Sequence, residues 1–288
     1  MKKIGVIGCG LMGEGMIRNL LKQDYEVFIF DIKEEITLPL VEAGAKKVEN
    51  ILSLAKEVSV IIVSLPSPEV IYEVLVEELF PALQPDSYVL DMSTNDVSIT
   101  REIEKKGKEK SINFFDCPVS GGPAGANTGT LTIMVGGAKE KYLDILPTLK
   151  NIGDKVEYVG KSGAGQIVKL CNNMMVGGII SLASEVLKTG EGLGVSKKQI
   201  TNLMQQGSAQ TKVMEVFGPS ILEENFKDVK FSLTNMMKDI NLYQKMSNEI
   251  GVNPKISNPV ETLYRSAMQA GNETKDATVI FKEFTLSN

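Results

Sequence analysis

The chain has 288 residues, of which 43% are hydrophobic, and its 31 basic and 36 acidic side chains leave a formal net charge of −5. This length allows two domains with substantial cores, and an acidic balance without a basic cluster argues against a nucleic-acid partner. No signal peptide precedes Ile4, and the apolar runs fall short of the roughly 20 residues that span a bilayer, so we expect a cytoplasmic protein without a membrane partner.

The first elements along the chain read as strand, glycine turn, helix and strand, over residues 4–7, 8–13, 14–26 and 27–30. In such a turn Gly8 allows a tight bend, Gly10 lets the backbone approach a pyrophosphate, and Gly13 lets the helix pack closely on the strand. The amides of Leu11 and Met12 open the helix, where the helix dipole favours negative charge. The pattern predicts a dinucleotide-binding site, and a purely structural turn is the alternative.

Asp31 follows the second strand and bears on the choice of cofactor. A carboxylate at this position accepts hydrogen bonds from the adenosine ribose hydroxyls, whereas it repels the 2′-phosphate of NADP. Glu34 and Glu35 add to the negative field, and Lys33 is the one nearby residue that could compensate. The signs of these charges predict NAD rather than NADP.

Short apolar runs with helical segments between them continue to about residue 160, and they are residues 58–63, 88–91, 113–116, 131–135 and 156–159. Strands that alternate with helices predict a mainly parallel sheet with right-handed crossovers. Beyond Gly163 only helical periodicity remains, over residues 166–191, 197–206, 232–250 and 259–270. We therefore predict a nucleotide-binding α/β domain over 1–160 and an all-helical domain over 161–288.

A glycine-rich loop at 116–125 offers a second site. Gly121 and Gly122 follow Ser120 and leave several backbone amides unobstructed, which suits a carboxylate, with the serine hydroxyl as an added donor. An ordinary connection between strands remains the alternative for this loop taken alone.

Lys169 stands among apolar residues of a predicted helix, with Asn173 one turn further on the same face. Two adjacent asparagines, Asn172 and Asn173, are poor helix formers, which indicates that something other than helix stability retains them. Because the chain has no histidine, another residue must carry out any proton transfer, and a lysine in a cleft can do so. A structural lysine that extends its amine to the surface is the alternative.

The three cysteines, Cys9, Cys117 and Cys171, are widely spaced and form no CxxC pair. They read as small buried residues in a reducing compartment, so we expect neither a disulfide framework nor a metal site. The pair Lys238-Asp239, taken alone, reads as an ordinary surface couple.

Together these segments resemble the β-hydroxyacid dehydrogenase family, whose members include 3-hydroxyisobutyrate dehydrogenases and tartronate semialdehyde reductases. Separated motifs match in order along essentially the whole chain: GVIGCGLMGEGM at 5–16, DCPVSGG with GTLTIMVGG at 116–137, GAGQIVKLCNN at 163–173 and KDINL at 238–242. The resemblance implies a Rossmann-type domain joined by a long helix to a helical domain, with the active site between them. It also makes the helical domain over 161–288 a substrate and oligomerisation domain, through which subunits pair as a homodimer or homotetramer.

The resemblance further implies a role for each matched residue. Lys169 corresponds to the catalytic acid/base, Asn173 to a residue that holds substrate and lysine, and Ser120-Gly121-Gly122 to the carboxylate site. The cofactor-binding positions correspond to Gly8, Gly10, Leu11, Met12, Gly13, Asp31, Leu65, Pro66, Ser93, Thr94 and Lys238.

The implied reaction interconverts a small β-hydroxy acid and its semialdehyde with NAD and without a metal. Arg18, Arg101 and Arg265 are the only arginines and lie outside the substrate motifs, which disfavours phosphorylated substrates and favours 3-hydroxyisobutyrate and methylmalonate semialdehyde. Tartronate semialdehyde and succinic semialdehyde remain open. An imine reductase, in which the lysine is generally replaced, and a non-catalytic NAD-binding redox sensor are more distant alternatives.

Overall fold

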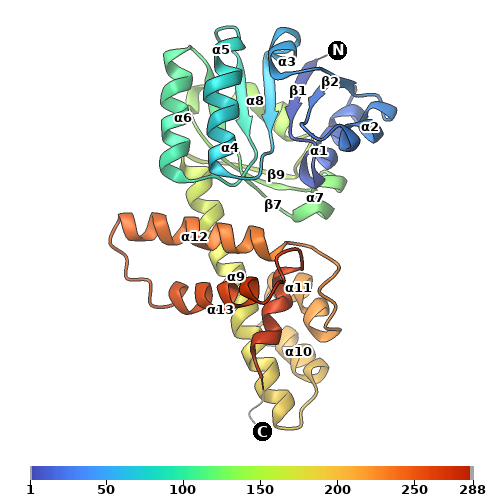
Figure 1. Cartoon of the computed structure of the whole chain (residues 1–288), viewed down its shortest axis with the longest axis vertical. Coiled ribbons are helices and arrows are strands. Elements are labelled where there is room, and N and C mark those ends of the chain that lie inside the picture. The colour runs from blue at the N-terminus through green and yellow to red at the C-terminus, as the bar shows by residue number, and fades with distance from the viewer. Residues whose placement is uncertain (1, 286–288) are drawn as a thin grey trace. The chain divides into compact units, whose positions relative to one another are not determined.

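The computed structural model describes residues 2–285, which belong to two compact units, Met1–Lys169 and Leu170–Asn288. The first unit is a sheet with helices on both faces, and the described part of the second unit consists of helices (Figure 1). Helix α9 (Ala164–Gly192) starts in the first unit and continues into the second. These features confirm the predicted class, a Rossmann-type domain followed by a long helix and an all-helical region.

The sheet of the first unit has the strand order β3-β2-β1-β4-β5-β6-β8-β7, with β9 paired to β8. Its strands are β1 (Lys3–Ile7), β2 (Glu26–Phe30), β3 (Lys46–Lys47), β4 (Val60–Val63), β5 (Tyr88–Asp91), β6 (Asn113–Asp116), β7 (Val119–Ser120), β8 (Thr132–Gly136) and β9 (Lys155–Gly160). The pairs from β3 to β6 are parallel, as predicted, whereas β8 runs antiparallel to both β6 and β7. The chain moves from β1 to β2 and β3, and then returns to β4 on the other side of β1.

Helices of the first unit cover both faces of this sheet. They are α1 (Leu11–Lys22), α2 (Glu34–Glu42), α3 (Ile51–Glu57), α4 (Pro68–Tyr72), the π-helical η1 (Glu73–Leu79), α5 (Phe80–Ala82), α6 (Val97–Glu109), α7 (Gly122–Thr128), the 3₁₀ turn η2 (Lys139–Lys141) and α8 (Tyr142–Leu149). Ser67 caps α4 by accepting a hydrogen bond from the Val70 amide, and Pro68 occupies the first helical position, as the local sequence favours.

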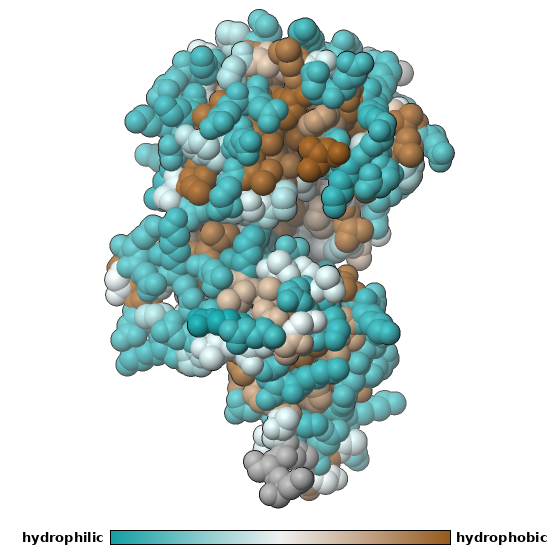
Figure 2. Space-filling view, in the orientation of Figure 1, coloured by the Kyte–Doolittle hydropathy of each residue, from teal (hydrophilic) through white to brown (hydrophobic). Residues whose placement is uncertain are grey.

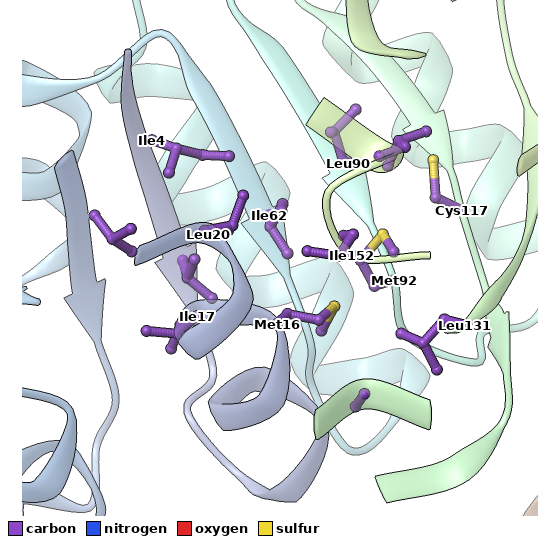
Figure 3. Packing of buried hydrophobic residues seen from close by; sticks show 14 of the residues in the cluster. Ile4, Met16, Ile17, Leu20, Ile62, Leu90, Met92, Cys117, Leu131 and Ile152 are labelled. Atoms are coloured by element: carbon purple, nitrogen blue, oxygen red, sulfur yellow. The ribbon is translucent and has the colours of Figure 1, made fainter. Parts of the chain in front are cut away.

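Two hydrophobic clusters hold these helices on the sheet. One includes Met16 and Leu20 of α1, which pack with Ile4 and Ile62 of the central strands (Figure 3). The other joins α3, α4, η1 and α6 to the sheet through residues such as Leu54, Ile71, Leu75 and Ile103. The central strands bury apolar side chains in both clusters, as expected for a parallel sheet covered on both faces.

The second unit has its own core around α9. Its other helices are α10 (Lys197–Gln206), α11 (Lys212–Leu222), α12 (Leu233–Glu249), α13 (Ser257–Gln269) and the 3₁₀ helix η3 (Ala277–Glu283). Ile180, Met236, Tyr264 and Ile280 are fully buried members of this core. The sequence prediction missed α11, in which Pro219 and Gly218 interrupt the helical pattern.

Helix α9 corrects two predictions. Its 29 residues are long and apolar enough to cross a membrane by length and composition alone, although no such run was expected. Half of its most apolar window is buried inside the chain, and buried core helices pass the same test. In addition, Cys171 is exposed rather than buried, whereas Cys9 and Cys117 are buried as predicted.

Hydrophilic residues cover most of the face in Figure 2, with the hydrophobic residues in separate groups.

Candidate active site

The predicted cofactor residues of the first unit gather at the carboxyl ends of neighbouring parallel strands. Gly8 follows β1, Leu65 and Pro66 follow β4, and Ser93 and Thr94 follow β5. The strand order reverses between β1 and β4, because the chain leaves β1 toward β2 and returns on the opposite side. Open α/β sheets bind ligands at such a switch point.

The three glycines of the first turn differ in what requires them. Gly8 has φ of +90°, and a Cβ there would lie 2.1 Å from the Ser64 carbonyl oxygen. A Cβ on Gly13 would lie 2.0 Å from the Gly8 carbonyl oxygen. A Cβ on Gly10, by contrast, would meet no atom within 4 Å, and the backbone there is extended. The fold itself thus requires Gly8 and Gly13, whereas Gly10 borders open space.

That open space lies at the N-terminus of α1. Gly10 is the N-cap residue of α1 and supplies no side-chain hydrogen bond to the first turn, where Leu11 is 68% exposed. Uncapped amides and the positive end of the helix dipole make this a suitable place for an anion. Because Gly10 has no side chain, nothing of that residue stands between these amides and an approaching pyrophosphate, so the turn suits a dinucleotide cofactor.

Two backbone amides, one in the turn after β1 and one just after β2, hold the Asp31 carboxylate at the end of β2. Its Oδ2 accepts a hydrogen bond from the Cys9 amide at 2.8 Å, and its Oδ1 accepts one from the Lys33 amide at 2.8 Å. Each carboxylate oxygen can accept more than one hydrogen bond, so these contacts orient Asp31 and leave capacity for ribose hydroxyls. The next residue, Ile32, is 89% exposed.

The loops after β4 and β5 are hydrogen-bonded to each other. The Leu65 amide donates to the Ser93 hydroxyl at 2.9 Å. The fully buried Gln166, in the first turn of α9, donates from Nε2 to the Ser93 carbonyl and accepts from the Asn95 amide, both at 2.9 Å. The sequence prediction did not include Gln166, because its partners lie far away in the chain.

Ser120, Gly121 and Gly122 form a sharp turn between β7 and α7. Gly121 has φ of +130° and Gly122 has φ of +60°, values that other residues rarely adopt. Helix α7 packs on α1, where the Asn19 side chain donates to the Ala126 carbonyl at 2.6 Å. The glycines therefore have a conformational reason, and the carboxylate site remains a prediction.

Lys169 and Asn173 both belong to α9, where they lie one turn apart, as predicted. Lys169 is 8% exposed and Asn173 is 4% exposed, so both side chains are largely buried. The Asn173 amide donates to Asp239 Oδ2 at 2.5 Å and accepts from Asn172 Nδ2 at 3.0 Å. Its orientation is therefore set within α9 and α12.

Asp239 is not part of a surface couple, which corrects the interpretation of Lys238-Asp239. Asp239 is 1% exposed, and its Oδ1 lies 3.4 Å from Lys238 Nζ. The helical pattern alone could have indicated its burial, because Asp239 lies three residues after Met236 and next to Ile240, both fully buried. Asp239 is a residue that sequence reasoning missed.

Asp116, the last residue of β6, is fully buried beside the start of α9. Its Oδ1 accepts a hydrogen bond from the Gly163 amide at 2.8 Å, and its Oδ2 accepts one from the Gln166 amide at 3.0 Å. Burial raises the pKa of Asp116 from 3.8 to about 7, helped by the charge of Asp91, although the backbone hydrogen bonds act in the opposite direction.

Among residues 2–285, no three His, Cys, Asp or Glu side chains are grouped so as to hold a metal ion.

Comparisons with known proteins cover both units. Residues 3–160 match the family model described as the NAD binding domain of 6-phosphogluconate dehydrogenase. Residues 163–284 match the one described as NAD-binding of NADP-dependent 3-hydroxyisobutyrate dehydrogenase.

Individual relatives extend over nearly the whole chain. A probable mitochondrial 3-hydroxyisobutyrate dehydrogenase of Dictyostelium discoideum is 31% identical, over 100% of this chain and 93% of that protein. An NAD-dependent L-serine dehydrogenase of Pseudomonas aeruginosa is 30% identical, over 99% of this chain and 98% of that protein. The structure of Mycobacterium tuberculosis 3-hydroxyisobutyrate dehydrogenase with L-serine superposes with a TM-score of 0.91 at 25% identity, covering 98% of this chain and 99% of that one.

The pKa of Asp116 predicts how stability depends on pH. Because the folded-state pKa of about 7 lies above the ordinary 3.8, the folded chain holds a proton that the unfolded chain releases between these pH values. The stabilisation is therefore complete below about pH 4 and is lost as the pH rises through about 7.

We expect the free energy of unfolding of wild type, minus that of Asp116→Asn, to fall by a few kcal/mol over this range, at about 1.4 kcal/mol per pKa unit. Urea unfolding of both proteins at several pH values measures this difference. A difference that stays constant with pH would show that burial does not raise the pKa of Asp116, and one that grows with pH would show that the folded chain lowers this pKa.

Proposed function

The chain belongs to the β-hydroxyacid dehydrogenase family of NAD(P)-dependent dehydrogenases, and from that premise we propose that it interconverts 3-hydroxyisobutyrate and methylmalonate semialdehyde. The observation that carries the proposal is the buried Lys169, one turn into the helix whose start is hydrogen-bonded to the loop after β5. The chain has no histidine that could take the place of this lysine.

Bound NAD would supply the nicotinamide ring that accepts a hydride from the hydroxyl-bearing carbon. Lys169 in its neutral form takes the hydroxyl proton during oxidation, and its ammonium form returns a proton to the carbonyl oxygen during reduction. Its low exposure limits access of bulk water to the proton being transferred.

Asn173 has the supporting role in this proposal. Its amide is oriented by Asp239 and Asn172, so it can present a fixed hydrogen-bonding group one turn from Lys169. Lys238 would approach the nicotinamide end of the cofactor, a role that rests on its match to the family motif.

The substrate is a small monocarboxylate in this proposal, bound by Ser120, Gly121 and Gly122. Two of the arginines already have carboxylate partners: Arg18 contacts Glu14, and Arg265 holds Glu261 through two nitrogens. A strong guanidinium clamp for a phosphate or a second carboxylate is therefore not offered by these two residues. This supports a substrate with one carboxylate and a short chain.

L-serine is the second candidate, because it is also a β-hydroxy monocarboxylate. A relative 30% identical to this chain is named an NAD-dependent L-serine dehydrogenase, and the similar Mycobacterium tuberculosis structure is that of the enzyme with L-serine. Tartronate semialdehyde and succinic semialdehyde remain further alternatives. The presence of Lys169 weighs against an imine reductase and against a non-catalytic redox sensor.

We also propose that the protein is a homodimer or homotetramer in the cytoplasm. A stripe of exposed apolar residues follows α9 at helical spacing, comprising Val168, Met175, Leu182 and Val186. Such a stripe supports burial against a second copy of the chain, since a solvated helix face is normally polar.

The proposed acid/base role predicts the effect of Lys169→Ala. Turnover of 3-hydroxyisobutyrate should fall by about 10²- to 10⁴-fold, the usual cost of losing a general acid/base, while NAD still binds. Steady-state absorbance of NADH measures turnover, and titration of NADH fluorescence measures cofactor binding.

Lys188→Ala is the matched control for this variant, because Lys188 lies on the same helix in an ion pair with Glu191. Its turnover should stay within about threefold of wild type. Near-normal turnover of Lys169→Ala would remove the basis of the proposed mechanism.

The position of Asp31 predicts cofactor preference. Wild type should have a higher kcat/KM with NAD than with NADP, because the carboxylate repels a 2′-phosphate. Replacing Asp31 with Ser together with Ile32 with Arg should shift the ratio toward NADP by at least about tenfold, since the guanidinium pairs with the phosphate.

Glu35→Gln removes one nearby exposed negative charge. It serves as the control for the effect of nearby negative charge in general, as distinct from that of the Asp31 carboxylate itself. It should change the ratio of the two kcat/KM values only slightly, because exposed charges are screened. A wild type that prefers NADP would show that Lys33 outweighs the surrounding carboxylates.

A further inference from the structure

Helix α9 begins without a cap of its own. The Ile167 amide donates to the Gly163 carbonyl at 3.0 Å, which makes Gly163 the residue that precedes the first turn. Side chains of Ser, Thr, Asp or Asn at this position normally accept hydrogen bonds from first-turn amides, and glycine cannot. Among residues 2–285, six other α-helices are, by contrast, capped by the residue just before them, namely Asn50, Ser67, Asp96, Ser196, Thr211 and Ser232.

The missing cap comes from the sheet. Asp116 accepts the Gly163 amide on one carboxyl oxygen and the Gln166 amide on the other, at 2.8 and 3.0 Å. These are two of the amides that a helix start leaves without an intrahelical partner. A residue 47 positions earlier, at the end of β6, thus supplies both bonds.

Two glycines make room for this carboxyl group. A Cβ on Gly136 of β8 would lie 2.5 Å from Asp116 Oδ1. A Cβ on Gly165 of α9 would lie 2.8 Å from Asp116 Oδ2 and 2.4 Å from the Met134 carbonyl oxygen. Glycine at both positions therefore allows α9 to start in contact with the sheet, with Asp116 enclosed between them.

The first turn of α9, which Asp116 caps, is also hydrogen-bonded to the loop after β5, which is proposed to contact the cofactor. Gln166 bonds through its backbone to Asp116 and through its side chain to Ser93 and Asn95. Ser93 in turn accepts the Leu65 amide. Lys169 follows Gln166 by three residues in the same helix, so these hydrogen bonds connect the helical turn that precedes Lys169 to the loops after β4 and β5.

We propose that Asp116 is a positioning residue for the dehydrogenase reaction: by capping α9 from the sheet, it fixes Lys169 relative to the loops after β4 and β5. The inference rests on the proposed function, because it takes Lys169 as the acid/base. Asp116 contacts neither substrate nor cofactor in this proposal and acts through the first turn of α9. A displacement of about 1 Å in a reacting group can cost about 10²-fold in rate.

The variant Asp116→Asn tests the proposal with little change in shape. One acceptor oxygen becomes an NH₂ group, which cannot accept the Gly163 or Gln166 amide. At pH 9, above the pKa of Asp116, kcat for 3-hydroxyisobutyrate should fall by about 10- to 100-fold. The KM for the hydroxy acid and the Kd for NADH, measured by fluorescence titration, should stay within about threefold.

Asp276→Asn is the matched control in the second unit. Asp276 is also fully buried and accepts backbone amides, from Lys230 at 2.8 Å, Phe231 at 3.1 Å and Thr278 at 3.0 Å. We expect both variants to have a lower midpoint of thermal unfolding than wild type. At temperatures well below these midpoints, the kcat of Asp276→Asn should stay near that of wild type, whereas the kcat of Asp116→Asn should fall. Equal losses of kcat in the two variants would reduce Asp116 to a structural role and overturn the proposal.

Gly136→Ala keeps Asp116 but moves its carboxyl group, and it provides the test if Asp116→Asn does not fold. Its kcat should also fall by about tenfold or more with KM nearly unchanged. Normal kcat in Asp116→Asn would overturn the inference, and if Asp116→Asn does not fold, normal kcat in Gly136→Ala would do so. The proposed function would remain intact in either case, provided that Lys169→Ala is inactive. Full turnover of Lys169→Ala would overturn both.

Discussion

A helix that begins after a glycine cannot cap its first turn with the preceding side chain, and α9 begins after Gly163. The buried carboxyl group of Asp116 meets this need from the end of β6. Two consequences follow for the rest of the first unit. The sheet and the helix that carries Lys169 become one hydrogen-bonded structure, and glycine is required at positions 136 and 165, around the carboxyl group.

The space around each glycine of the first turn shows whether the fold itself requires glycine there. A side chain at Gly8 or Gly13 would collide with backbone atoms of the chain, so a turn that binds no ligand would also require glycine at these two positions. Gly10 has no such neighbour, and a side chain there would project into the open space at the start of α1. This difference between neighbouring glycines supports a ligand at the turn more strongly than the spacing of the motif does.

Much of the fold could be predicted from the sequence because the signals are local. Residues close together in the chain determine the strand, glycine turn and helix at the N-terminus. The same is true of the Ser67-Pro68 cap and of the bounds of α10. The two-residue strands β3 and β7 are too short to show a pattern, and Pro219 masked α11. The roles of Gln166 and Asp116 depend on partners 47 to 73 positions away, which periodicity does not reveal.

The central claim is that the chain oxidises a small hydroxy acid that it recognises by its carboxylate. The most direct measurement compares kcat/KM, with NAD, for 3-hydroxyisobutyrate, L-serine and isobutanol, the last being the alcohol of the same carbon skeleton without the carboxylate. We predict that 3-hydroxyisobutyrate has the highest value and that isobutanol is lower by at least about 10³-fold, since the donors of a polar site would be left without a partner. Higher kcat/KM for L-serine would correct the substrate alone, whereas isobutanol reacting as well as the acid would contradict the central claim.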